Sequence, residues 1–350
     1  MSTANRMEKK SPIVALTTVP VEIGWQTEMA QAVRDVGELW ELLDLPSSAL
    51  PTSLATFPLR IPRAFVARME KGNLQDPLLR QVLPDSQEDN QVEGFVVDPV
   101  GDLAAIARGG ILHKYHGRVL IMTTGACPIH CRYCFRRHFP YSETLADHTW
   151  QGVVDYLQRH PAVQEVILSG GDPLMVKDER LAALVAALDQ LPQLQRLRLH
   201  TRMPVVLPSR VDRRLLAWLG KTRLATSVVL HINHPQELDD GVYRACQALK
   251  TKGVTLLNQS VLLRGINDEA AVLAALSEKL FAAGILPYYL HRLDPVAGGA
   301  HFQVELSRAQ ALWEELQQCL PGYLVPRLVQ EIPGAAAKVP INSPNWQAGR

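Results

Sequence analysis

From about residue 117 onward, the chain alternates short apolar stretches with longer runs of helical periodicity, and this alternation limits the folds it can adopt. Six such units without a hairpin signal predict a parallel sheet curled into a barrel or most of one. An open, doubly wound sheet is the alternative fold. The predicted strands are 118–124, 164–170, 196–201, 224–232, 253–263 and 285–293, and the predicted helices are 149–160, 179–191, 212–220, 237–253 and 269–284.

The pattern divides the chain into three parts. Residues 1–108 show helix-type periodicity broken by proline, with Pro62 near a predicted helix start, and carry no chemical motif. Residues 109–300 hold the β/α units. Residues 301–350 hold a predicted helix and then a Gly/Ala-rich stretch around Lys338, which taken alone resembles a surface lysine in a tail. We therefore expect an N-terminal helical extension, a (β/α)6 core and a C-terminal segment.

Three cysteines follow the first predicted strand with the spacing C-x3-C-x2-C, at Cys127, Cys131 and Cys134. Three thiolates within eight residues can hold one compact soft-metal centre. A closed zinc site needs a fourth ligand, and no fourth cysteine lies nearby. A [4Fe-4S] cluster held by three cysteines leaves one iron open. The spacing resembles the signature of the radical SAM superfamily, in which that iron binds S-adenosylmethionine; the alternative is three unrelated cysteines.

Other polar groups fall at the ends of the predicted strands, where barrel enzymes place their active sites. The turn 169–173 (SGGDP) follows the second strand, and its glycines either form a tight turn or let backbone approach a ligand. The pair His231 and His234 is a weak metal signal, so capping or ring packing is the preferred interpretation. A basic group either forms a solvated face or pairs with ligand carboxylates: Arg132, Arg136, Arg137 and His138.

Composition restricts the class of protein. A hydrophobic content of 47% and a formal net charge of +1 are typical of a soluble globular protein and argue against charge-driven nucleic-acid binding. No apolar run reaches the roughly 18 residues of a membrane span. The first residues lack the apolar core of a signal peptide, and five cysteines, three of them clustered, do not form a secreted disulfide framework. We expect a cytoplasmic protein.

Several phrases together resemble the lysine 2,3-aminomutase family, from about Leu112 to Lys338. They are LHKYHGRVLIMTTGACPIHCRYCFRRHF, SGGDPL, NHP, NQSVLLRGIND, PYYL and PGYLVP, in family order. The phrases RIPRAF, MEKGN, DPLLRQVL, CRYCFRRHFPY and GVTLLNQSVLLR are most similar to the short members that supply β-lysine for modification of elongation factor P. The resemblance implies a radical SAM partial barrel that converts L-lysine to (R)-β-lysine with a [4Fe-4S] cluster, S-adenosylmethionine and pyridoxal 5′-phosphate. It also implies a reductant protein, and a ligase that attaches the product to elongation factor P.

The resemblance assigns roles by position. The three motif cysteines would hold the cluster, and Lys338 would form the Schiff base with pyridoxal phosphate. Arg136 would bind the substrate carboxylate, and Asp294 and Glu331 would receive the distal ammonium. Contacts to S-adenosylmethionine would come from Gly170, Gly171, Asp172 and Gln259, and contacts to the phosphate and ring of pyridoxal phosphate from Lys114, Tyr115 and Arg118.

Some positions depart from the family pattern. Lys114 stands where the family has Arg, which alters a bidentate contact, and Glu331 stands where it has the shorter Asp. The glycine-rich stretch around the Schiff-base lysine is reduced to GAAAKVP. The chain ends at Arg350 without the zinc-binding extension of larger members, so their tetramer is not assumed.

Three alternatives stay open from the sequence. The enzyme could be a catabolic lysine 2,3-aminomutase. It could act on another amino acid such as arginine, whereas the acidic pair Asp294 and Glu331 argues against glutamate. It could also be a cluster-bearing binding or redox-sensing protein without turnover.

Overall fold

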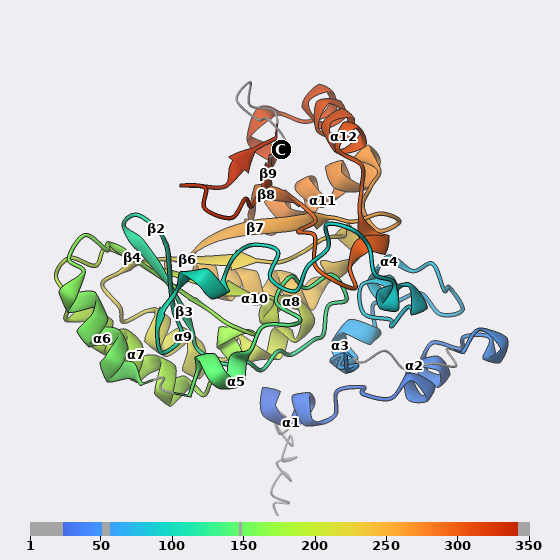
Figure 1. Cartoon of the computed structure of the whole chain (residues 1–350). Helices are drawn as coiled ribbons and strands as arrows, with labels where there is room; N and C mark the ends of the chain where they lie inside the picture. The colour runs from blue at the N-terminus through green and yellow to red at the C-terminus, as the bar shows by residue number, and fades with distance from the viewer. Residues whose placement is uncertain (1–23, 51–56, 147–148, 342–350) are drawn as a thin grey trace, which may run out of the picture.

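The computed structural model describes residues 24–50, 57–146 and 149–341, and these form one curled sheet covered by helices (Figure 1). Within these ranges the strands lie side by side in chain order, β1 to β10. Their bounds are β1 (Ile106–Arg108), β2 (Ile111–Tyr115), β3 (Arg118–Met122), β4 (Glu165–Ser169), β5 (Arg196–Thr201), β6 (Ala225–Leu230), β7 (Thr255–Leu262), β8 (Leu286–Arg292), β9 (Arg327–Gln330) and β10 (Val339–Pro340).

The parallel part of the sheet runs from β3 to β9. A doubly wound sheet reverses its strand order at a switch point, whereas here every strand neighbours the next one in the chain. The curled, singly wound arrangement therefore confirms the partial barrel. In the described ranges β1 and β10 are the two edges of the sheet and do not pair with each other, so the barrel stays open.

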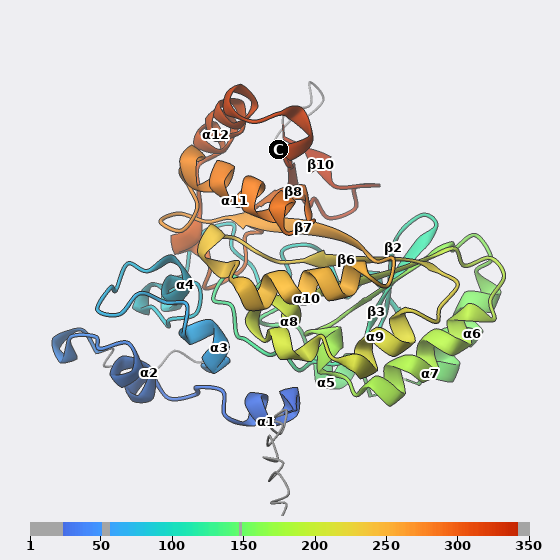
Figure 2. The ribbon, with the colours of Figure 1, turned by 180° about the vertical axis from the view of Figure 1, so that it is seen from behind.

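Helices follow the parallel strands and lie on the outer face of the sheet, as the rear view shows (Figure 2). Each predicted helix of the core is present, although with slightly different ends. The bounds of this layer are α5 (Tyr141–Thr144), α6 (Trp150–Arg159), α7 (Asp178–Asp189), α8 (Met203–Val206), α9 (Arg213–Leu219), α10 (Asp240–Lys250), α11 (Ala270–Ala282) and α12 (Leu306–Cys319).

The sheet also contains antiparallel pairs that lie outside the six predicted β/α units. Strands β2 and β3 pair antiparallel across the two-residue link His116-Gly117, where Gly117 has a φ of 74°. Strand β9 adds a seventh parallel strand beside β8, and β10 pairs antiparallel with β9. The short link and the four-residue β9 give weak sequence signals, because periodicity needs longer windows.

The N-terminal part contains shorter helices than its periodicity predicts. The helical periodicity is interrupted at Val33, whose backbone exchanges hydrogen bonds of 2.8 and 2.9 Å with Ile61. Pro62 does precede a helix start. Residues 1–23 and 51–56 lie outside the described residues, so the prediction that the first residues lack a signal peptide is not tested. The helices are α1 (Trp25–Ala30), α2 (Val36–Leu42), α3 (Arg63–Val66) and α4 (Pro77–Arg80).

These N-terminal helices pack into the same core as the barrel. Leu39, Phe65 and Leu78 are fully buried and belong to one hydrophobic cluster with Leu168 of β4 and Leu199 of β5. The extension is thus held by hydrophobic burial against the sheet. The three-part division of the chain stays a prediction.

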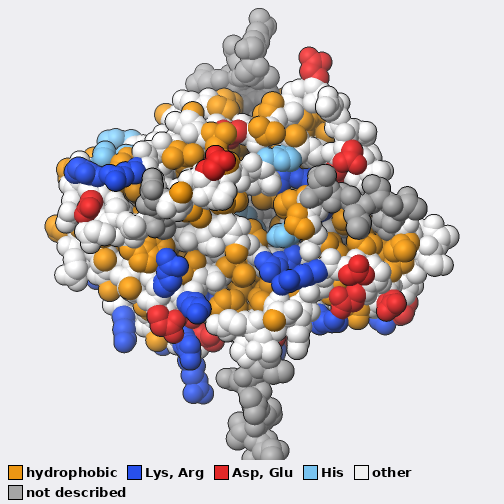
Figure 3. Space-filling view, turned by 60° about the horizontal axis from the view of Figure 1, so that its bottom comes forward, with side chains coloured by type: hydrophobic (Ala, Val, Ile, Leu, Met, Phe, Trp, Pro, Cys, Tyr) orange, Lys and Arg blue, Asp and Glu red, His pale blue; other side chains and the backbone are white. Residues whose placement is uncertain are grey.

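One face of the molecule carries side chains of both charges, interspersed with hydrophobic and polar ones (Figure 3). Of the helices that the structure describes, none is long and apolar enough to cross a membrane.

Candidate active site

The three motif cysteines lie in the loop between β3 and α5, at the carboxyl end of the first parallel strand. All three are free thiols with part-buried side chains. Burial, together with the neighbouring cysteines, raises the pKa of Cys127 well above its usual value and that of Cys134 to about 11. Metal binding would therefore have to displace the thiol protons.

No set of three or more His, Cys, Asp and Glu side chains among the described residues is arranged to hold a single metal ion. A four-iron cluster is larger than one ion and holds its thiolates farther apart. Its donors are cysteine thiolates, which are the groups this loop supplies. The loop therefore supplies donors of the type that an iron–sulfur cluster takes.

The turn after β4 holds the cysteine loop by close backbone contact. Gly171 donates from its N–H to Thr124 O (2.7 Å), and Asp172 donates to Ala126 O (2.9 Å). A Cβ atom on Gly170 would lie 2.4 Å from Thr124 O, and one on Gly171 would lie 2.4 Å from Ala126 O. The glycines are thus required by the approach of the loop backbone.

The carboxylate of Asp172 is buried and bonded within the protein. It accepts from the hydroxyl of Thr201 (2.7 and 2.9 Å) and from the N–H groups of Leu174 (3.0 Å) and Arg202 (2.8 Å). Burial raises its pKa, and these hydrogen bonds oppose the shift. The Asp172 side chain therefore ties β4 to β5, and the predicted contact to S-adenosylmethionine stays a prediction.

The N-terminal part braces the same loop, which sequence reasoning missed. Arg60 donates to Cys127 O (3.1 Å), and His130 N–H donates to Arg60 O (3.0 Å). Arg132 pairs with the buried Glu88, and so does Arg137. Arg132 and Arg137 are therefore not a solvated face. The sequence around Arg132 does not identify Glu88 as its partner, because the two residues are 44 positions apart.

A second polar cluster surrounds Lys338. The ammonium of Lys338 contacts Glu331 Oε2 at 2.6 Å, and the hydroxyl of Tyr115 donates to Glu331 Oε1 at 2.5 Å. Although burial alone would raise it, the pKa of Glu331 is lowered by Lys338 and by these hydrogen bonds. The guanidinium of Arg118 lies 4.3 Å over the Tyr115 ring. The structure thus brings predicted cofactor and substrate residues together.

Asp102 joins this cluster to the cysteine loop. Its carboxylate pairs with Lys114 (2.5 Å) and with Arg136 (2.7 Å), two residues after Cys134. Arg136 also donates to Ser169 Oγ (3.2 Å). Although burial opposes it, these cations lower the pKa of Asp102. Sequence reasoning found no chemical motif in residues 1–108, and nothing there distinguished Asp102 from other acidic residues.

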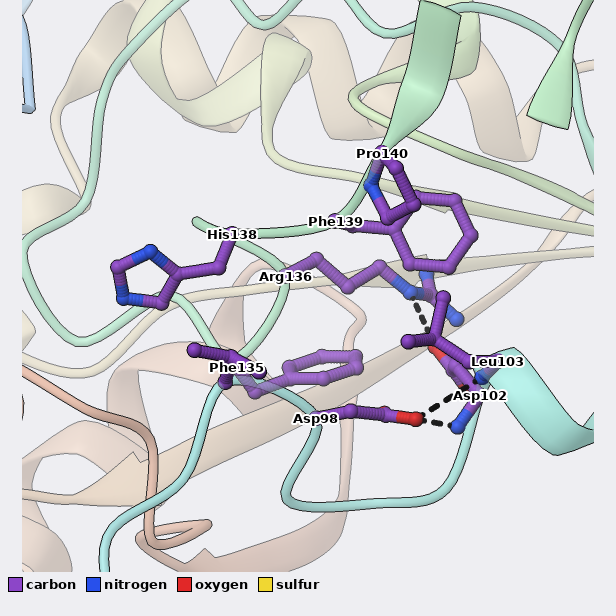
Figure 4. A pocket seen from close by; sticks show the side chains of 9 residues that line it. Asp98, Asp102, Leu103, Phe135, Arg136, His138, Phe139 and Pro140 are labelled. Carbon is purple, nitrogen blue, oxygen red and sulfur yellow. Dashed lines mark hydrogen bonds and ion pairs between the residues drawn. The ribbon is translucent and has the colours of Figure 1, made fainter. Parts of the chain in front are cut away.

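Asp102 and Arg136 line a small pocket (Figure 4). Asp98 positions Asp102 by accepting from its N–H (2.9 Å) and from that of Leu103 (3.0 Å). Phe135 and Phe139 also line the pocket. The ring Nε2–H of His138 donates to Ala297 O (3.0 Å), outside the ion-pair cluster. Arg136 alone of the four predicted basic residues pairs with Asp102.

The interior of the barrel holds polar atoms without protein partners. His200 Nε2, His291 Nε2 and Asp294 Oδ1 are buried and make no hydrogen bond. Burial lowers the pKa of His231 to about 3 and those of His200 and His291 well below the usual value, so these rings are neutral near pH 7. Unpartnered buried polar atoms are costly and mark places where a polar ligand fits.

Gln259 and the histidine pair have defined places. Gln259 on β7 lies 3.3 Å from His231 Nε2, inside the barrel. His234 instead caps the 3-10 turn 235–237 by accepting from Gln236 N–H (3.2 Å). The geometry thus matches the preferred interpretation of His234 as a capping residue.

Comparison with known proteins gives consistent results. The model of the Radical SAM superfamily matches residues 121–276. An L-lysine 2,3-aminomutase of Haemophilus influenzae is 48% identical over 321 residues, which cover 91% of this chain and 95% of that protein. An L-lysine 2,3-aminomutase of Escherichia coli is 45% identical, covering 94% and 97%. One of Clostridium subterminale is 32% identical, covering 92% and 78%.

Proposed function

Given that the chain belongs to the lysine 2,3-aminomutase family of the radical SAM superfamily and is an isomerase, we propose that it converts L-lysine to (R)-β-lysine. The cofactors are a [4Fe-4S] cluster, S-adenosylmethionine and pyridoxal 5′-phosphate. The observation that carries the proposal is the continuous polar connection from the cysteine loop through Arg136, Asp102 and Lys114 to Glu331 and Lys338.

The reaction needs more than acid–base chemistry, since an unactivated C–H bond must break. When bound, the cluster with S-adenosylmethionine supplies a radical able to remove that hydrogen, and pyridoxal phosphate supplies a π-system for the migrating amine. The protein must position the reactants and exclude water. The partial barrel, closed on its outer face by helices, supports both tasks.

Lys338 is the residue proposed to carry pyridoxal phosphate. In the structure its ammonium pairs with one carboxylate oxygen of Glu331, and the other oxygen accepts from the Tyr115 hydroxyl. Lys114 and Arg118 add positive charge nearby, suited to a phosphate group. Loading of the lysine would remove its ammonium from Glu331 and leave that carboxylate available to another cation.

The substrate's two ends require opposite charges. Arg136, part-buried and kept cationic by Asp102, is proposed to bind the α-carboxylate. Glu331 and Asp294 are proposed to receive the distal ammonium, because an unpaired ammonium costs several kcal/mol to bury. Burial raises the pKa of Asp294 to about 7, and nearby Lys338 opposes this shift. A substrate ammonium at this place would likewise favour the carboxylate form.

The proposed pathway is the supply of (R)-β-lysine to a ligase that attaches it to elongation factor P in the cytoplasm, with a reductant protein as electron donor. Its support is the set of phrases shared with the short family members and the higher identity to the relatives from Haemophilus influenzae and Escherichia coli than to that from Clostridium subterminale.

The activity is tested by anaerobic assay of the reconstituted enzyme with a panel of free amino acids. We expect turnover of L-lysine to β-lysine, and turnover of arginine alone would refute the substrate assignment. The pathway is tested separately by the intact mass of elongation factor P in a deletion strain. We expect a loss of one β-lysyl group, and an unchanged mass would reject the pathway but not the chemistry.

A further inference from the structure

Arg202 directly follows β5 and reaches the central cysteine of the motif. Its Nη1 donates to Cys131 Sγ at 2.7 Å and to the hydroxyl of Tyr133 at 2.9 Å. The residue is 6% exposed, so this contact is shielded from water. A charged donor in a shielded site forms a stronger hydrogen bond than the same group at the surface.

The other side of the guanidinium is fixed by buried acceptors. Nη2 donates to Gln81 Oε1 (2.6 Å) and to Glu237 Oε2 (2.9 Å). Glu237 is fully buried and also accepts from Asn233 N–H (2.9 Å). Gln81 comes from the N-terminal part, and its backbone O accepts from Arg132 N–H (2.9 Å) within the cysteine loop. Arg202 is thus held in one orientation toward Cys131.

A cluster gains negative charge when it is reduced, and its thiolate ligands share that charge. Hydrogen bonds to the ligand sulfurs are among the features that set the reduction potential of an iron–sulfur cluster. A donor aimed at Cys131 stabilises the reduced form more than the oxidised form, so it raises the potential. Glu237 balances the charge of Arg202 overall but lies on the far side of the guanidinium from the sulfur.

We propose that Arg202 is a positioning residue that orients Cys131 and raises the reduction potential of the cluster through its hydrogen bond to that sulfur. The proposal rests on the proposed cluster. Iron and sulfide analysis tests the cluster, and the potential tests Arg202, so the two failures are distinguishable.

The experiment is a redox titration of the anaerobically reconstituted full chain, without S-adenosylmethionine, lysine or pyridoxal phosphate. The reduced cluster is followed by electron paramagnetic resonance. Because removing one partner of a buried ion pair is strongly destabilising, the variants are Arg202→Lys and the double variant Arg202→Met with Glu237→Gln. The matched control is the double variant Arg210→Met with Asp178→Asn, since Arg210 is also fully buried and pairs with Asp178 (2.9 Å) away from the cysteines.

In the double variant we expect the reduced-to-oxidised ratio at a fixed potential to fall at least tenfold, which is a shift of about 59 mV for one electron. Arg202→Lys should shift in the same direction by less, and the control double variant at Arg210 and Asp178 should keep the wild-type potential. A fully loaded cluster at the wild-type potential in the double variant would overturn the proposal. Loss of iron from both Arg202 variants, with the control loaded, would overturn it too, because Arg202 would then be needed to build the site.

Discussion

The contact between the turn after β4 and the cysteine loop makes Gly171→Ala an informative substitution. The added Cβ would lie 2.4 Å from Ala126 O, whereas ordinary van der Waals contact begins at 3.4 Å. The backbone of one segment must therefore move by about 1 Å, at an overpacking cost of about 1–3 kcal/mol. The movement also strains two hydrogen bonds, from Gly171 to Thr124 and from Asp172 to Ala126, each worth about 0.5–1.5 kcal/mol.

We therefore expect Gly171→Ala to lose about 2–6 kcal/mol of unfolding free energy in the cluster-free protein. The measurement is urea unfolding followed by tryptophan fluorescence. The unfolding free energies of variant and wild type are compared provided that their dependence on urea concentration (the m-value) is the same. Cluster content after reconstitution should fall as well, because the displaced segment carries Cys127. Gly322→Ala is the matched control, since its Cβ would meet nothing within 4 Å. Equal stability and iron content in the two variants would refute the steric argument.

Three further predictions concern the cofactors and the substrate. Alanine at any one of the three motif cysteines should abolish cleavage of S-adenosylmethionine, measured as 5′-deoxyadenosine; iron and sulfide near zero in the reconstituted wild type would contradict the cluster itself. Borohydride reduction should fix pyridoxal phosphate on Lys338, and Lys338→Ala should keep its iron; a peptide map with the adduct elsewhere would reject the assignment. Asp294→Ala should lose far more turnover on lysine than on an analogue without the distal amine, and equal losses would show that Asp294 does not read the ammonium.

The pH dependence of stability gives one more test. Burial raises the pKa of Asp294 to about 7, while its pKa in the unfolded chain is about 3.9. Between these values the folded state holds a proton that the unfolded state releases, so stability falls as the pH rises from about 4 to about 7. The cofactor-free wild type should therefore lose stability over this window relative to Asp294→Asn. Parallel curves for the two proteins would show that the group does not titrate as described.

The sequence predicted the parts of the fold that rest on local pattern. The six core strands and their helices follow from apolar periodicity, and the grouping of candidate residues follows from the rule that strand ends meet at one edge. Positional resemblance brought Lys338 and Glu331 into consideration, and they do lie in contact. Their roles toward cofactor and substrate stay predictions.

The missed features depend on contacts between distant segments. Asp102 lies 34 residues from Arg136 and Gln81 lies 121 residues from Arg202, and neither residue type nor spacing identifies such partners. The β2–β3 hairpin was missed because its link is only two residues long. Buried ion pairs are set by three-dimensional packing, which single-sequence periodicity does not encode.

The contacts that residues 57–95 make with the cysteine loop determine how much of this protein would have to be transferred to build the same site in another barrel. The superfamily match begins at residue 121, yet Arg60, Gln81 and Glu88 contact the loop from outside it. A fragment cut at the start of the barrel would keep every cysteine and lose these supports. Grafting the motif onto another barrel would therefore require transplanting its N-terminal scaffold as well.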